Sequence, residues 1–383
     1  MIIIADLHIG KTNDSFLNPD GVASQTLDVR KRLKTILARA KLTRQHIVVA
    51  GDVFNRVNPT TQSIAELFLW LKDCKQAKVE VHLMAGNHDA GVNWSNMVML
   101  EGADLPNVTV TVGPSHVSLT EGQGIAAYTS EILLWPHITL TEREKAEQGH
   151  GSVSKWVAAM YPQAEFIITH GQISMDYENE IFFEAGDAMK IEPEEFPKLK
   201  LMVLGHVHDH KSNGFTNPSS KQLTRWVYPG SLTINNFGEV DDRKGWVEVN
   251  LSSPSYTVYD WYEFPADVTP WVHIELDLTD KDELSLDEGK ISDLVSGAVI
   301  KITVLAKAHG VVDETYIRKL FNKYGYVSRF ETVVEGVVKT TGPQKQLSHK
   351  ELLENYLKGV DATKEQKVLA FGLGSRMIER LNA

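Results

Sequence analysis

The chain has 383 residues, 42% of them hydrophobic, a formal net charge of −11 and one cysteine, Cys74. This length predicts two or three domains with a buried core, and a single cysteine excludes an internal disulfide and favours the reducing cytoplasm. No apolar run is long enough to cross a membrane, the start lacks the basic residues of a signal peptide, and the acidic balance disfavours a broad nucleic-acid surface.

The first part of the chain alternates between short apolar strands and amphipathic helices, which predicts βαβ units with a parallel sheet. We expect strands at residues 2–4, 46–50 and 79–83 and helices at 27–40 and 60–75. Further strands are expected at 108–112, 117–119, 125–128, 132–135, 166–169, 201–204, 226–228, 245–249 and 255–262, with one helix at 141–160. These elements form the first predicted domain, residues 1–264.

The character of the chain changes between Pro265 and Pro270. Strands expected at 271–278, 299–305 and 327–334 and a helix at 312–324 predict a small separate α+β domain, residues 265–338. A Gly-Pro linker at 340–343 leads to two amphipathic helices at 348–360 and 368–381 in the last segment, residues 339–383. Their apolar stripe could pack on the protein's own core, but its place after a linker favours docking on a partner.

Polar side chains stand at the ends of five predicted strands. They are Asp6 and His8, Asp52, Asn87 and His88, His170, and His206 and His208. All are oxygen or imidazole donors without a thiolate, a set that suits two divalent ions of the Mn, Fe, Zn or Mg type. Two positions apart in an extended chain, Asp6 and His8 would point the same way and could share one ion, and Asp52 could bridge the pair. Any one of these residues alone would be read as a satisfied core or turn group, but together they predict a metal centre.

The order of these motifs resembles the calcineurin-like metallophosphoesterases. The matching segments are Asp6-Leu7-His8, Gly51-Asp52, Gly86-Asn87-His88-Asp89, His170-Gly171 and Gly205-His206-Val207-His208. A narrower resemblance, to the SbcD-type nuclease subunit of DNA double-strand-break repair, comes from looser matches. These are Leu134-Trp135-Pro136, Tyr228-Pro229-Gly230-Ser231, Phe237-Gly238-Glu239 and Lys244-Gly245.

The resemblance implies an α/β fold, a metallophosphoesterase sandwich of two packed sheets flanked by helices. It also implies that residues 265–338 are a DNA-binding capping domain and that residues 339–383 bind an SMC-like ATPase of the SbcC type. A homodimer through helices near the active site, at 60–75 and 93–101, is a further expectation, with DNA as the substrate. The ATPase would supply much of the DNA-binding surface, which the acidic chain itself lacks.

The resemblance also implies roles for the strand-end residues. Asp6, His8 and His208 would hold a first metal ion, and Asn87, His170 and His206 a second, with Asp52 bridging both. Mn²⁺ is the usual ion of the family, while the donor set also permits Mg²⁺, Fe²⁺ or Zn²⁺. His88 is the candidate acid for the leaving oxygen or a stabiliser of the transition state, and its loss should cost roughly 10²- to 10⁴-fold in rate.

Four further residues lie in or close to these motifs in the sequence. Asn55 stands where nucleases of this family often carry a second histidine, so it could bind a phosphate but could not supply a mobile proton near neutral pH. Asp89 could orient His88 or only cap the next helix. Arg56 and Lys11 could contact DNA phosphates or be solvated surface cations.

Two other functions remain open on the sequence. The first is another phosphoesterase of the same superfamily, such as a protein or small-molecule phosphatase. Ala85 disfavours a protein phosphatase, because those enzymes usually have arginine before Gly-Asn-His. The second is a non-catalytic scaffold that has lost its metals, and the complete set of candidate ligands argues against it.

Overall fold

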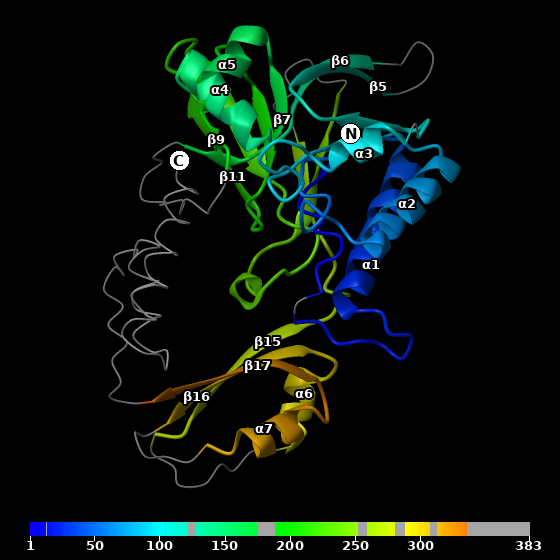
Figure 1. Ribbon diagram of the computed structural model, residues 1–383, viewed down its shortest axis with the longest axis vertical. Helices are drawn as coiled ribbons and strands as arrows, with labels where there is room; N and C mark the ends of the chain where they lie inside the picture. The colour runs from blue at the N-terminus through cyan, green and yellow to red at the C-terminus, as the bar shows by residue number, and fades with distance from the viewer. Residues whose placement is uncertain are drawn as a thin grey trace, which may run out of the picture.

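The computed structural model describes residues 1–12, 14–103, 105–121, 128–174, 188–251, 259–279, 288–306 and 312–334. Two six-stranded sheets pack together in its main body, and a three-stranded sheet forms a second body beside it (Figure 1). No helix among these residues is long and apolar enough to cross a membrane.

The first sheet has the strand order β14-β13-β1-β2-β3-β4. Its strands are β1 (Ile2–Ile4), β2 (Ile47–Val49), β3 (Val81–Met84), β4 (Val108–Thr111), β13 (Gly245–Val249) and β14 (Tyr259–Glu263). Strands β1 to β4 are parallel, and β13 and β14 join them in antiparallel pairing beside β1. The connections are α1 (Ser24–Thr43), α2 (Thr61–Gln76) and the short α3 (Met97–Glu101). The predicted βαβ units with a parallel sheet are therefore confirmed.

The second sheet has the order β11-β12-β10-β7-β6-β5. Its strands are β5 (Ser115–Glu121), β6 (Tyr128–Trp135), β7 (Phe166–His170), β10 (Leu201–Gly205), β11 (Lys211–Thr216) and β12 (Leu223–Tyr228). The four inner strands are parallel, and each edge strand is antiparallel to its neighbour. Between strands lie α4 (Leu140–His150), α5 (Val153–Met160), the short pair β8 (Gln172–Ile173) and β9 (Lys190–Ile191), and the 3₁₀ turn η2 (Pro193–Glu195).

The main body is a layered sandwich. Its inner core lies between the two sheets, where Ile3 and Val48 of the first sheet share an apolar cluster with Val203 of the second. The outer faces of the sheets pack against α1 and α2 on one side and against α4 and α5 on the other (Figure 1). This arrangement confirms the predicted fold class of two packed sheets flanked by helices.

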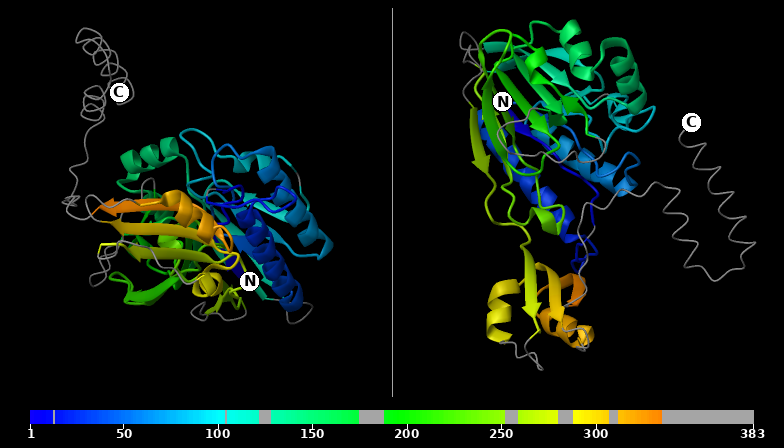
Figure 2. Two further views of the ribbon diagram at one scale, coloured as in Figure 1. Left: turned by 90° about the horizontal axis from the view of Figure 1, so that it is seen from below. Right: turned by 90° about the vertical axis from the view of Figure 1, so that its left-hand side faces the viewer.

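The second body has its own apolar core and alternates strands with helices. It consists of β15 (Trp271–Asp277), α6 (Glu288–Val295), β16 (Val299–Ala306), α7 (Glu314–Phe321) and β17 (Tyr326–Val334). All three strands are parallel, and the right-hand view of Figure 2 shows this body at one end of the sandwich. The predicted linker and helices of residues 339–383 lie outside the described residues.

Several elements of the main body differ from the sequence predictions, among them the short strands β8 and β9, which were not predicted. The helix expected at 141–160 is two helices, because Gly151 ends α4 at a φ of 85° and the Ser152 side chain caps α5. Strand β6 begins at Tyr128, four residues before the strand expected at 132–135, and the strand expected at 125–128 lies mostly outside the described residues. Strand β11 was not predicted, since only Phe215 within it is a large apolar residue.

Candidate metal centre

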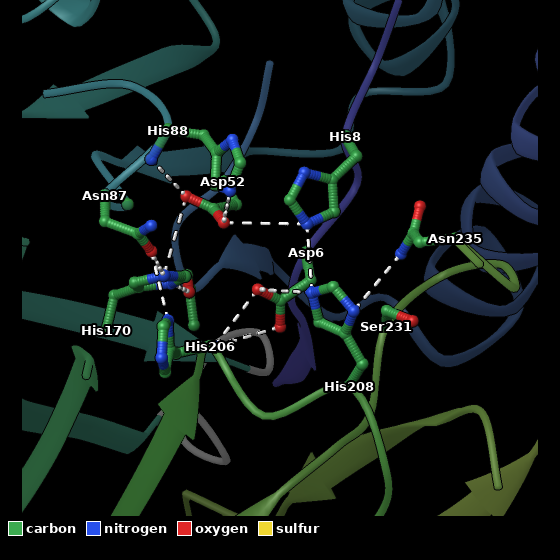
Figure 3. A network of polar contacts seen from close by, with 12 residues as sticks. Asp6, His8, Asp52, Asn87, His88, His170, His206, His208, Ser231 and Asn235 are labelled. Atoms are coloured by element: carbon green, nitrogen blue, oxygen red, sulfur yellow. Dashed lines mark hydrogen bonds and ion pairs between the residues drawn. The ribbon is translucent and has the colours of Figure 1, made fainter. Parts of the chain in front are cut away.

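The residues predicted from the five strand ends come together at one edge of the two sheets. Loops after β1, β2 and β3 bring the donors of the first sheet, and the ends of β7 and β10 bring those of the second. Figure 3 shows Asp6, His8, Asp52, Asn87, His88, His170, His206 and His208 facing a common space. The parallel order of the inner strands explains this convergence, because their carboxyl ends lie on the same side.

The loops after β1 and β2 hold their ligands in an unusual backbone conformation. Asp6, His8 and Asp52 have φ values of 53°, 44° and 51°, and His206 after β10 has a φ of 99°. Such values are uncommon for residues other than glycine and mark positions held by their surroundings. The two loops are joined by hydrogen bonds from Asp6 N to Gly51 O and from His8 N to Asp52 O, of 3.1 and 3.0 Å. The expectation that Asp6 and His8 share a site through an extended chain is therefore wrong, since a turn brings them together.

The first group of donors consists of Asp6, His8 and His208. The Nε2 atoms of the two histidines lie 3.0 Å apart, and His208 Nε2 lies 4.0 Å from Asp6 Oδ1. His208 Nδ1 lies 2.8 Å from a carboxylate oxygen of Glu239. Because a carboxylate can only accept, Nδ1 carries the proton and the Nε2 lone pair of His208 faces the site.

The second group consists of Asn87, His170 and His206. The side-chain oxygen of Asn87 lies 3.0 Å from both His170 Nε2 and His206 Nδ1. His170 Nδ1 donates to the carbonyl of Ala50 at 2.8 Å, so Nε2 carries a lone pair, and this lone pair faces the side-chain oxygen of Asn87. Two acceptors facing each other at this distance fit a site that holds a cation.

Asp52 lies between the two groups and is 1% exposed. One of its oxygens is 3.5 Å from His170 Nε2 and the other is 3.5 Å from His8 Nε2. Each carboxylate oxygen thus faces one group, which is the placement expected of a bridging ligand.

The electrostatics of the site also fit divalent cations. Burial raises the pKa of Asp6 to about 6 and that of Asp52 well above its usual range. Burial lowers the pKa of His206 to about 4 and those of His8 and His170 well below the usual value. The imidazoles are therefore held neutral, as metal ligands must be, and a bound cation would favour ionised carboxylates beside them.

A cleft of about 810 Å³ opens beside the centre. Asp52, Asn87, His206 and His208 form part of its wall, and His88 lies in it with 43% of its side chain exposed. Figure 3 shows the His88 ring beside Asp52, whose Oδ1 accepts from the His88 backbone N–H at 2.9 Å. The candidate ligands are therefore reached from an open cleft.

His88 is fixed from the side away from the centre. Its Nδ1 donates to the backbone carbonyl of Asn55 at 2.9 Å, which leaves Nε2 facing Asp52 at 4.0 Å. Burial lowers the pKa of His88, and the backbone of Asn55 opposes this effect. The backbone of Asn55, rather than its side chain, therefore supports His88.

The remaining predicted residues occupy different positions. Asn55 and the exposed Arg56 line the cleft, whereas half-buried Lys11 lies outside its lining. Both readings of Asp89 are wrong: its fully buried carboxylate accepts from the backbone N–H groups of Val53, Phe54 and Gly86, at 2.9 to 3.0 Å. It ties the loop after β2 to the loop after β3 and neither orients the His88 side chain nor caps α3.

The sequence predictions missed three residues at the site. His137 and Arg143 line the cleft, and Glu239 contacts His208. His137 follows β6, so the rule that selects strand ends could have found it. Arg143 on α4 carries no comparable signal, whereas Glu239 in the 3₁₀ turn η3 (Phe237–Glu239) belongs to one of the looser matching segments, which assigned it no role at the site.

Comparison with known proteins gives two findings. Residues 1–210, which contain all eight strand-end residues, match the family of calcineurin-like phosphoesterases. Among solved structures, the chain is similar to a dimetal phosphatase from Danio rerio. The two share 12% identity over 64% of this chain and 91% of that chain, with a TM-score of 0.39.

Proposed function

Because the chain belongs to the calcineurin-like phosphoesterase family, we propose that it is the metal-dependent DNA nuclease subunit of an SbcCD-like repair or recombination complex. Members of this family are phosphoesterases, which are hydrolases, and the chain has clusters of Asp and His residues that could hold two metal ions. One observation carries the proposed reaction: lone pairs from both sheets converge on Asp52 beside an open cleft.

Each of the two groups of donors would bind one metal ion. Asp6, His8 and His208 would hold one ion and Asn87, His170 and His206 the other, with Asp52 shared. Two divalent cations bound there, proposed to be Mn²⁺, would lower the pKa of a bound water and neutralise charge on the phosphate. Asp52 presents one oxygen to each group, as a shared ligand would.

His88 is the proposed proton donor to the departing sugar oxygen. Its Nδ1 proton is donated to the Asn55 carbonyl, so only Nε2 can reach a substrate in the cleft. To act as the donor, the ring must first take up a second proton from solvent at Nε2 and then release that proton to the sugar oxygen. Asn55 cannot serve as a second acid, because an amide has no proton to transfer near neutral pH. A single imidazole would therefore act on the leaving group.

Two features favour DNA over a small ester. The cleft of about 810 Å³ is much larger than one phosphate, and Arg56 and Arg143 in its lining can contact neighbouring phosphates. The second body, residues 265–338, extends beyond what a small substrate needs and is the proposed DNA-binding cap. The proposed SMC-like ATPase of the SbcC type would bind residues 339–383 and add a basic surface.

The test is cleavage of linear double-stranded and single-stranded DNA with Mn²⁺ or with chelator. We expect chelator to abolish cleavage, His88→Ala to lower kcat by roughly 10²- to 10⁴-fold, and Asp52→Ala to remove both activity and bound metal. His116→Ala is the matched control, because it removes an exposed imidazole of β5 that is not among the cleft-lining residues. It should leave the rate unchanged.

A small phosphodiester, bis(p-nitrophenyl) phosphate, separates the alternatives. Cleavage of this ester without any cleavage of DNA would point to another phosphoesterase of the family. No cleavage of either substrate, even with the ATPase partner added, would point to a scaffold.

A further inference from the structure

A buried carboxylate stands behind one of the candidate metal ligands. Glu239 is 6% exposed, and its Oε1 lies 2.8 Å from His208 Nδ1. We propose that Glu239 is a positioning residue, held by Lys244, that keeps His208 in the tautomer and orientation whose Nε2 faces the Asp6 and His8 side of the centre. The proposal rests on the metal centre of the proposed function but not on DNA as the substrate.

The hydrogen bond decides the tautomer of His208. A carboxylate has no proton to donate, so the proton of the contact belongs to Nδ1 and the Nε2 lone pair is free for a ligand role. The amide nitrogen of Asn235 also approaches Nδ1, but at the longer distance of 3.5 Å (Figure 3). A carboxylate behind a ligating histidine both fixes its orientation and makes it a stronger ligand.

Glu239 is itself held firmly. Besides His208, it accepts from Asn236 Nδ2 at 2.6 Å, from the backbone N–H of Asn235 at 3.0 Å and from Lys244 Nζ at 2.9 Å. The oxygen that faces His208 therefore has little freedom to turn away. A buried carboxylate with this many donors around it stays ionised and rigid.

Lys244 ties the same carboxylate to the backbone of the ligand. It is 8% exposed and donates to Glu239 Oε2, to Asp242 Oδ2 at 3.1 Å and to the backbone carbonyl of His208 at 3.0 Å. One ammonium thus holds the carboxylate against the side chain and main chain of His208 together. Removing one partner of such a buried pair would leave the other charge uncompensated.

The arrangement makes the two groups of ligands unequal. His170, in the second group, donates its Nδ1 proton to the neutral carbonyl of Ala50, whereas His208 donates to an anion. Loss of the Glu239 charge should therefore weaken the ion held by Asp6, His8 and His208 and leave the other ion nearly unchanged. This selectivity separates a positioning role from a general loss of structure.

The experiment is a calorimetric titration of the metal-free full chain with Mn²⁺, comparing wild type with Glu239→Gln. Outer hydrogen-bond partners of ligating histidines typically contribute 10- to 100-fold in metal affinity, so we expect one of two binding events to weaken by about that factor. Glu248→Gln is the matched control: Glu248 is 8% exposed, paired with Arg39 at 2.7 Å and bonded by Trp246, but lies on β13 away from the centre. It should leave both affinities unchanged.

A second measurement reads the tautomer directly. In ¹⁵N-histidine-labelled protein, His208 of the metal-free wild type should carry its proton on Nδ1, and its resonances can be assigned with His208→Asn. In Glu239→Gln, an amide nitrogen turned toward the ring would require an unprotonated Nδ1, so the Nε2–H tautomer should become populated.

Three outcomes would overturn the proposal. These are unchanged Mn²⁺ affinity and tautomer in Glu239→Gln, an equal loss in Glu248→Gln, and no Mn²⁺ binding by wild type. Tight binding that weakens as expected, in a protein that cuts no DNA, would support the positioning role and refute only the nuclease.

Discussion

His82 is a buried imidazole outside the candidate metal centre. It is 5% exposed on β3, and neither ring nitrogen has a hydrogen-bond partner among the residues that the structure describes. Burial, helped by the nearby His46, lowers the pKa of His82 to about 4. In the unfolded chain His82 has a pKa near 6.5, so it binds a proton at a pH where the folded chain does not. Folding stability therefore falls as the pH drops from about 6.5 to about 4.

Replacing His82 by leucine should remove this pH dependence. By linkage, His82 should lower the unfolding free energy of wild type by about 2 kcal/mol between pH 8 and pH 5. In His82→Leu, the decrease between these two pH values should be smaller by the same amount. Urea unfolding at the two pH values, with metal-free protein, measures the difference. His116→Leu should keep the wild-type dependence, and parallel behaviour of His82→Leu and wild type would contradict the assignment.

At the same scale, sequence motifs located the candidate ligands but not their supports. The candidate ligands could be predicted because each one follows an apolar strand and belongs to a short motif. The contact of Glu239 with His208 could not be predicted, although Glu239 belongs to a matching segment, because it lies 31 residues further on and meets His208 only through the path of a loop. The role of Asp89 is hidden for the same reason, because two of its three partners, Val53 and Phe54, belong to the loop after a different strand.

At the scale of elements, the loops after β2 and β3 touch where Gly86 ends its strand. A Cβ atom on Gly86 would lie 2.1 Å from Asp52 Oδ1 and 2.2 Å from the Asp52 backbone nitrogen. No side chain fits at such distances, so the absence of a side chain is what lets the two loops approach. The bridging position of Asp52 depends on this contact.

Gly86→Ala should therefore separate the loops. We expect a loss of about 3 kcal/mol in unfolding free energy and of at least 10-fold in Mn²⁺ affinity, measured by denaturation and calorimetry. Gly102→Ala is the control, because its nearest neighbour is 3.6 Å away and its φ of −70° suits alanine. It should be neutral or slightly stabilising. Wild-type metal binding by Gly86→Ala would show that the loops tolerate separation.

The strands and helices themselves were predictable to different degrees. Buried parallel strands such as β7 read clearly as apolar runs, and α2 as an amphipathic stretch. The break at Gly151, which separates α4 from α5, is not predicted by the sequence, because glycines such as Gly149 and Gly151 in a helical pattern do not always end a helix. The polar edge strand β11 gains its structure from pairing with β12 rather than from its own residues.

At the scale of the whole molecule, a few contacts attach the second body to the sandwich. Arg329 of β17 pairs with Asp14, and Phe237 of η3 packs at 4.8 Å from Trp271 of β15. Arg32 of α1 pairs with Asp267 just before β15 at 2.8 Å. Because η3 also carries Glu239, the same turn contacts both the second body and the candidate metal centre.

Arg329→Ala combined with Phe237→Ala should loosen this attachment. An exposed ion pair contributes at most about 1 kcal/mol, so we expect a small loss in total stability but a separate low-temperature transition for the second body in calorimetry. Lys301→Ala, which removes an ion pair with Glu331 inside the second body, should keep a single transition or shift it slightly. One unsplit transition in the double variant would show that other contacts couple the two bodies.

Exposed apolar residues border the cleft and bear on the homodimer that the family resemblance leads us to expect. They are Val92, Trp94, Val98, Met99 and Leu140, which are 40% to 58% exposed. Hydrogen bonds from Leu140 N to Gly91 O and from Thr141 N to Val92 O hold the start of α4 beside the loop before α3, which brings Leu140 close to Val92. Clustered apolar residues of this kind mark protein interfaces, and Trp is enriched among the residues that dominate binding.

Trp94→Glu should therefore convert a dimer into monomers. Loss of a central tryptophan typically costs 2 kcal/mol or more, which corresponds to roughly a 30-fold rise in the dimer Kd, measurable by analytical ultracentrifugation. Leu42→Glu is the matched control, because Leu42 is 77% exposed on α1 and not one of these apolar residues. Since Val92 and Leu140 also line the cleft, a dimer would extend the cleft wall with a second copy. In that case Trp94→Glu should reduce cleavage of DNA more than cleavage of bis(p-nitrophenyl) phosphate, whereas a monomeric wild type would contradict the dimer.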